Sequence, residues 1–111
     1  IFTEKLKSLL KLGFRSTRYK DIFDFYYLIN MAGLDKNKLI KSIEILIIND
    51  ESMREKSIYE ITKRLDNIFK SPRYLNNLNN PEVNWLDISI DEAIETVVDY
   101  IDNLSDIKIS V

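Results

Sequence analysis

Cysteine and histidine are both absent from this 111-residue sequence. Their absence excludes disulfides, thiolate catalysis and histidine-based zinc sites within the chain. Glycine and proline are scarce, with two of each, which leaves little material for the turns of an all-β fold. No apolar run reaches the length of a membrane span, and no secretory signal pattern occurs. We therefore expect a cytoplasmic protein that has no membrane partner.

The net charge of −2 conceals a gradient along the chain. Residues 1–20 carry six Lys and Arg against one Glu, whereas residues 80–111 carry one Lys against eight Asp and Glu. The basic opening suits the phosphate groups of a nucleotide or a nucleic acid, and the acidic end does not. A nucleic-acid-binding surface over the whole domain is therefore not expected.

Apolar residues recur at helical spacing in five stretches, and each stretch is bounded by capping or breaking residues. Together they predict an all-α fold, an irregular bundle of about five helices in a single domain over residues 1–111. The expected helices run from Thr3 to about Leu12, from Ser16 or Thr17 to Met31 or Ala32, from Asp35 to about Ile48, from Ser52 or Ser57 to Phe69 or Lys70, and from Ser89 to about Leu104.

The buried stripe of the first helix is expected to hold Leu6, Leu9, Leu10 and Phe14. Residues 71–88 read as a connector with room for at most a short helix, because asparagines and Pro81 interrupt it. Within it, Trp85 is expected to plug the bundle together with Tyr74 and Leu78 rather than to stack on a base. Lys108–Val111 is expected to form a frayed or short extended end.

The stretch Arg18–Leu28 combines charges with aromatic residues at the start of the second predicted helix. On a helix, Arg18, Lys20, Asp21 and Asp24 become neighbours at three- and four-residue spacing. The opposite side is expected to face the core with its apolar residues, which are Tyr19, Ile22, Phe23, Tyr26 and Ile29. Such a cluster is either a solvated face or part of an active site supported by its packed underside.

Two segments together resemble the last two motifs of the AbiEii-type (AbiEii/AbiGii) nucleotidyltransferase toxins. The first is the helical Glu4-Lys5-Leu6, and the second has the form Arg-x-Lys-Asp-x-x-Asp, here Arg18 to Asp24. The match is close over roughly the first thirty residues and general in helical character beyond them. Four charged positions fixed at once make the second segment fairly specific, whereas Glu-Lys-Leu alone would mean little.

The resemblance implies a toxin of a toxin–antitoxin or phage abortive-infection pair that uses a nucleoside triphosphate. By this likeness Lys5, Asp21 and Asp24 are catalytic residues, and Lys5, Arg18 and Lys20 contact phosphate. We expect both carboxylates to be ionised, because they lie near the positive end of the helix dipole beside two cations. They would then orient a lysine rather than act as general acids.

The chain begins with Ile1 rather than Met, so we expect a fragment or a processed product, and by the resemblance it is the C-terminal part of a larger nucleotidyltransferase. The Gly-Ser turn and spaced aspartates that hold nucleotide and Mg²⁺ in the family are not found in the sequence. The resemblance therefore places them in an upstream domain, with NTP and Mg²⁺ implied for the intact protein and no cofactor or metal for this chain alone. It also implies that this chain alone is inactive, and related toxins suggest tRNA as one acceptor.

Other interpretations stay open at this point. Lys5 can be a solvated lysine on an amphipathic helix, and Asp21 and Asp24 can be ordinary ion-pair partners. The whole chain can be a non-enzymatic helical interaction module whose last helix docks a partner. A nucleic-acid-binding domain rests only on the basic first twenty residues. The acidic outer face of the last helix more often means solvation than metal binding, and its residues are Asp91, Glu92, Glu95, Asp99 and Asp102.

Overall fold

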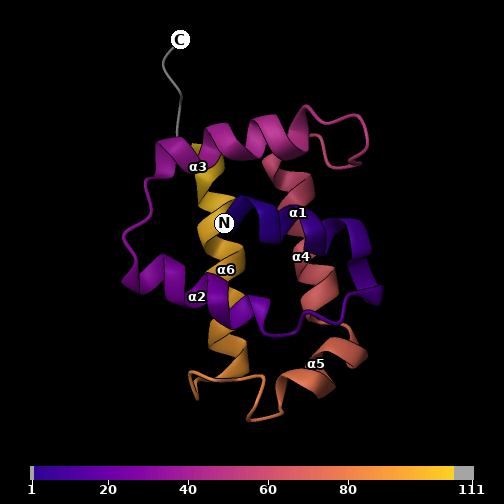
Figure 1. Ribbon diagram of the computed structural model, residues 1–111, viewed down its shortest axis with the longest axis vertical. Coiled ribbons are helices and arrows are strands. Elements are labelled where there is room, and N and C mark those ends of the chain that lie inside the picture. The colour runs from indigo at the N-terminus through magenta and orange to yellow at the C-terminus, as the bar shows by residue number, and fades with distance from the viewer. Residues whose placement is uncertain (1, 107–111) are drawn as a thin grey trace.

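Helices account for all the regular structure in the computed structural model, which describes residues 2–106 (Figure 1). The six α-helices are α1 (Phe2–Leu12), α2 (Asp21–Met31), α3 (Lys36–Ile43), α4 (Ile58–Phe69), α5 (Pro72–Leu78) and α6 (Ile90–Asn103). Short 3₁₀ turns follow α1 at Gly13–Arg15 and α6 at Leu104–Asp106, and α3 continues as a π-turn over Glu44–Ile48. The all-α prediction is confirmed for this range, with α5 as the additional short helix. The expected extended end at Lys108–Val111 lies outside it.

The helices form two sets that cross one another (Figure 1). α4 and α6 lie side by side along the long axis, while α1, α2 and α3 lie across them. α2 packs mainly on α6, and α1 contacts α2, α3 and α4. Three helices therefore contact α1, which fixes the direction of the side chains on its packed faces.

One hydrophobic core joins all six helices, and most of the predicted stripes point into it. Leu6, Leu9 and Leu10 of α1 are buried as expected, but Phe14 is 48% exposed because the chain turns away at Gly13. On α2, Phe25 is fully buried against Phe2 of α1, with ring centroids 4.7 Å apart. The stripe predicted for α2 omits Phe25, because contact with both α1 and α6 buries a wider strip than one helical face.

The helix ends follow the capping signals in three cases. Asp35, Ser57 and Ser89 each cap the following helix through a side-chain oxygen that accepts a backbone N–H. Of the two candidate starts for α4, the structure uses Ser57. Gly13 and Gly33, which follow α1 and α2, adopt positive φ of 56° and 62°, a conformation that glycine takes without steric cost.

Two predicted caps are wrong. α2 begins at Asp21 rather than after Ser16 or Thr17, because Ser16 uses its hydroxyl to accept the N–H of Arg18 at 3.2 Å. That bond closes a local turn, and residues 16–18 stay outside the helix. Thr3 lies inside α1 and is buried.

Candidate functional site

Lys5 projects from the buried middle of α1 toward the start of α2, although sixteen residues separate it from Asp21. Its ammonium nitrogen lies 3.4 Å from Asp21 Oδ1 and 3.2 Å from Asp24 Oδ2. Both carboxylates hold the same ammonium because they sit three residues apart on one helix. Lys5 is therefore the central cation of an ion-pair cluster, and the interpretation of Lys5 as a simple solvated lysine is wrong.

Arg18 completes the cluster from the non-helical segment before α2. Its Nε donates to Asp21 Oδ2 at 2.9 Å, and its side chain remains 47% exposed. Asp21 itself is buried, with 4% of its side chain accessible, so two cations compensate a carboxylate removed from water. Lys20 forms no ion pair within residues 2–106 and stays at the surface. We call Lys5, Arg18, Lys20, Asp21 and Asp24 the Lys5 cluster.

Helix α5 packs against the segment that carries Arg18 and holds it in place. Tyr74 of α5 is buried and stacks edge-on against Tyr19, with ring centroids 4.8 Å apart. Arg73 Nε donates to the Tyr19 hydroxyl at 3.1 Å, and the Tyr74 hydroxyl donates to Ser16 Oγ at 3.5 Å. The site thus depends on a helix from the stretch that the sequence marks only as a connector.

A pocket of about 410 Å³ opens directly over the Lys5 cluster. All five residues of the cluster line it, together with Thr17, Tyr19 and Val83. The structure therefore places every site residue predicted from the sequence at one cavity. Four of the five also bond to one another directly, and Lys20 joins only as a lining residue.

Every carboxylate oxygen of the cluster accepts one hydrogen bond, whereas the two cations have more N–H groups than these bonds use. Each oxygen of Asp21 and Asp24 accepts one bond, from Lys5, Arg18 or the indole N–H of Trp85. An ammonium has three N–H groups and a guanidinium five, so Lys5 keeps one donor and Arg18 four. The cluster therefore offers hydrogen-bond donors and positive charge to a ligand in the pocket, a combination that suits an anion such as phosphate.

A divalent cation does not fit the same residues. Mg²⁺ needs oxygen ligands close to ideal octahedral geometry, and here the Lys5 ammonium and the Arg18 guanidinium already lie against the carboxylates and would repel a second cation. Elsewhere in residues 2–106, no three His, Cys, Asp or Glu side chains group so that they could hold a metal ion. We derive no catalytic step through Mg²⁺ bound to this chain.

Trp85 is the residue of this site that sequence reasoning misplaced. It does not plug the bundle: it is 47% exposed, and its Nε1 donates to Asp24 Oδ1 at 3.1 Å. Its ring lies 5.7 Å from the ring of Tyr27, which is itself 43% exposed. No signal in the sequence links Trp85 to Asp24, because the two are sixty-one positions apart and joined only by the fold. Tyr74 and Leu78, expected to plug the bundle with Trp85, are buried.

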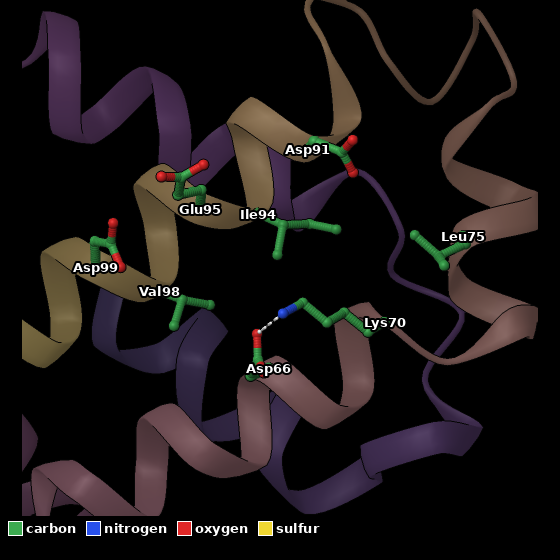
Figure 2. Close-up of a pocket in the computed structure, with 8 residues that line it drawn as sticks. All are labelled: Asp66, Lys70, Leu75, Asp91, Ile94, Glu95, Val98 and Asp99. Atoms are coloured by element: carbon green, nitrogen blue, oxygen red, sulfur yellow. Dashed lines mark ion pairs between the residues drawn. The ribbon is translucent and has the colours of Figure 1, made fainter.

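A second cavity, of about 530 Å³, lies between α4, α5 and α6 (Figure 2). Its floor is apolar, and Asp91, Glu95 and Asp99 line its α6 side at four-residue intervals. Lys70 is held by Asp66 at 3.0 Å, which leaves the rim predominantly acidic. Carboxylates repel phosphate, so this cavity does not suit an anionic ligand.

Comparison with known proteins gives one match. A family model described as nucleotidyl transferase AbiEii toxin, type IV TA system, matches residues 1–99, a range that includes the Lys5 cluster and Trp85. No curated protein and no solved structure matches the chain. Between residues 2 and 106, no helix is both long and apolar enough to cross a membrane.

Proposed function

The chain belongs to the AbiEii family of nucleotidyl transferase toxins of type IV toxin–antitoxin systems, and on that premise we propose that the Lys5 cluster binds the triphosphate of a nucleotide. One observation carries the proposal. Each carboxylate oxygen of Asp21 and Asp24 already accepts a hydrogen bond, whereas donors of Lys5, Arg18 and Lys20 remain available at an open pocket. Membership in the family implies an antitoxin partner and a nucleotide substrate in general terms.

Nucleotidyl transfer places specific demands on such a cluster. A hydroxyl oxygen of the acceptor attacks the α-phosphorus and gives its proton to water, the bond between the α-phosphorus and the bridging oxygen breaks, and pyrophosphate leaves with that electron pair. Negative charge therefore grows on the leaving group, where positioned donors stabilise the transition state. In our proposal, Lys5 and Arg18 donate to these phosphate oxygens. Asp21 and Asp24 hold the Lys5 ammonium at one point, which avoids the cost of ordering a flexible side chain during the reaction.

We propose that this chain contributes the C-terminal helical part of the enzyme. A Gly-Ser turn and metal-binding aspartates would then come from an upstream domain, with Mg²⁺ supplying charge neutralisation there. The ion pairs of the Lys5 cluster support this division, since the cations that hold its carboxylates would repel a metal ion. A tRNA or another polyanionic acceptor is consistent with the basic first twenty residues. Alone, this chain is expected to bind nucleotide without transferring it.

Two lysines of α1 provide a matched pair for the test. Lys5 and Lys7 have side-chain exposures of 24% and 25%, and each forms an ion pair with aspartate, Lys7 with Asp50 at 2.6 Å. In the intact protein, Lys5→Ala should reduce the rate of nucleotide transfer by at least about 100-fold, as loss of one transition-state donor does. Lys7→Ala should leave the rate near that of the unaltered protein. Transfer of radiolabelled nucleotide measures both.

A third variant separates charge from folding. Asp21→Asn keeps the shape of the buried side chain, removes the charge that orients Lys5, and should slow transfer while circular dichroism stays unchanged. Equal transfer rates for Lys5→Ala, Asp21→Asn and the unaltered protein would overturn the proposal. That result would favour the interpretation of this domain as a non-enzymatic interaction module.

A further inference from the structure

The connector between α5 and α6 holds Trp85 in a defined place. The Asn84 side chain donates to the Ile88 carbonyl at 2.7 Å and accepts the Ile88 N–H at 3.2 Å, which closes a loop around Trp85. The backbone N–H of Trp85 donates to the Val83 carbonyl at 2.9 Å, and Asp87 turns the chain with a φ of 52°. Such local bonds specify one backbone path for the segment. The position of the indole is therefore built into the connector.

Packing does not account for the exposure of this indole. Its single N–H is satisfied by Asp24, yet 47% of Trp85 and 43% of Tyr27 remain accessible. The two rings lie 5.7 Å apart at 47° and form one aromatic surface. Asp24 and Tyr27 are three residues apart on α2, so the aromatic surface and the Lys5 cluster share one helix face. An exposed aromatic pair beside a cationic pocket is the combination that binds nucleotides and single-stranded nucleic acids.

We infer that Trp85 performs two tasks at the Lys5 cluster: it positions Asp24, and with Tyr27 it forms a platform on which a nucleobase stacks. The inference rests on the proposed function, because it presumes that phosphate binds at the cluster. Asp24 carries Lys5 on one oxygen and the indole N–H on the other. The Asp24 carboxylate therefore lies between the Lys5 ammonium and the Trp85 indole. One nucleotide can reach both, with its phosphates at Lys5 and its base at Trp85.

Two sources can supply the base. It belongs either to the nucleoside triphosphate itself or to an unpaired nucleotide of a nucleic-acid acceptor. Every base has a π-face, so stacking tolerates any sequence. The platform should therefore contribute affinity with little discrimination between bases.

Trp85 is the only tryptophan of the chain, so its intrinsic fluorescence reports on the platform without a label. The 111-residue chain is titrated with each nucleoside triphosphate, with inorganic triphosphate and with a short single-stranded RNA, and calorimetry measures binding in parallel. Saturable quenching by nucleoside triphosphates assigns the base to the nucleotide, and saturable quenching by RNA alone assigns it to the acceptor. Inorganic triphosphate should bind with little quenching, because it has no base.

Two results overturn the inference in distinguishable ways. If inorganic triphosphate and nucleoside triphosphates bind equally tightly and neither the nucleotides nor the RNA quench Trp85, the platform is wrong while phosphate binding stands. If nothing binds at the Lys5 cluster, the proposed function fails together with the inference.

Substitutions in the intact protein separate the two tasks. Trp85→Phe keeps an aromatic face but removes the N–H, so the transfer rate kcat should fall about tenfold, as for a lost hydrogen bond to a charged group, with little change in KM. Tyr27→Ala keeps the Asp24 bond and should raise KM for the base-bearing substrate at least about fivefold. Tyr59→Ala removes an exposed tyrosine of α4 and serves as the control. If Trp85→Phe and Tyr27→Ala both match the control, Trp85 has neither role.

Discussion

At the scale of single residues, Tyr74 links the core to the segment that carries Arg18. It is 1% exposed and lies against Phe69 at 5.9 Å between ring centroids, in addition to its contact with Tyr19. Burial raises the pKa of Tyr74 to about 12, and the negative charge of nearby Asp21 contributes to the increase. Ionisation of the phenol is therefore disfavoured in the folded state relative to the unfolded chain.

This shift predicts a specific alkaline sensitivity. In the unfolded chain Tyr74 ionises near pH 10, whereas in the folded protein it holds its proton to about pH 12. The unfolded state binds fewer protons in that window, so the free energy of unfolding should fall as pH rises, by at most about 1.4 kcal/mol per pH unit. Urea unfolding across the window measures it. Tyr74→Phe should lose less stability over the same range.

The control for this prediction is Tyr59→Phe. Tyr59 is 65% exposed, so Tyr59→Phe changes a side chain that lies largely in water and should leave the alkaline loss unchanged. An identical loss in Tyr74→Phe and Tyr59→Phe would show that other groups cause it.

Two residues show what local sequence could not reveal about the site. Helical spacing correctly groups Asp21 with Arg18 and Asp24, but it places Asp21 among surface charges, whereas α1 covers it and supplies Lys5. Trp85 is a large apolar residue, and burial is the ordinary expectation for such a side chain. Its exposure follows from a connector path set by Asn84 and Asp87, which periodicity does not describe. The family resemblance predicted the motif and its partner Lys5, whereas the burial of Asp21 and the Trp85 contact could not be predicted.

At the scale of elements, the start of α4 shows how two equal signals are resolved. Both Ser52–Glu55 and Ser57–Glu60 have the form of a capping box. Ser52 donates its hydroxyl to Asp50 at 2.6 Å and is therefore committed to the turn after Ile48. Ser57 Oγ accepts the Glu60 N–H at 3.1 Å and caps the helix. Ser52 also donates its backbone N–H to Asp50, so both bonds fix it in that turn rather than at the start of a helix.

The assignment of Ser57 as the cap of α4 predicts that two similar serine substitutions lower the free energy of unfolding by different amounts. Ser57→Ala removes the acceptor for an otherwise unsatisfied N–H of α4 and should lower the free energy of unfolding by about 1 kcal/mol. Ser52→Ala removes one exposed turn contact and should cost less. Urea unfolding of both variants makes the comparison. A larger loss for Ser52→Ala would mean that the cap of α4 is misassigned.

At this scale the sequence largely predicts which helices form, because apolar periodicity and capping residues indicate the same helices for α3, α4 and α6. The short α5 forms despite its asparagines, since Tyr74 and Leu78 are buried by packing against the bundle. That gain depends on tertiary contact and leaves no clear local pattern. The π-turn at Glu44–Ile48 likewise has no distinguishing sequence signal.

At the scale of the whole molecule, the cations of the Lys5 cluster and the carboxylates of the second cavity lie on different elements. The Lys5 cluster is built from α1, the segment before α2 and the first turn of α2, whereas the acidic cavity of Figure 2 is built mainly from α4 and α6. A polyanionic ligand is attracted to the first region and repelled by the second. The fold thus turns the charge gradient of the sequence into two regions with different ligand preferences.

Amide chemical shifts of the isotope-labelled 111-residue chain, followed during separate titrations with ATP and adenosine, test most directly whether the Lys5 cluster binds triphosphate. ATP should shift the amides of Lys5 and of residues 18–24 saturably, and the affinity should fall as salt screens the cations. Adenosine, which lacks phosphates, should leave Lys5 and Arg18 unmoved. Saturable ATP shifts confined to α6, or none at residues 18–24, would contradict the account.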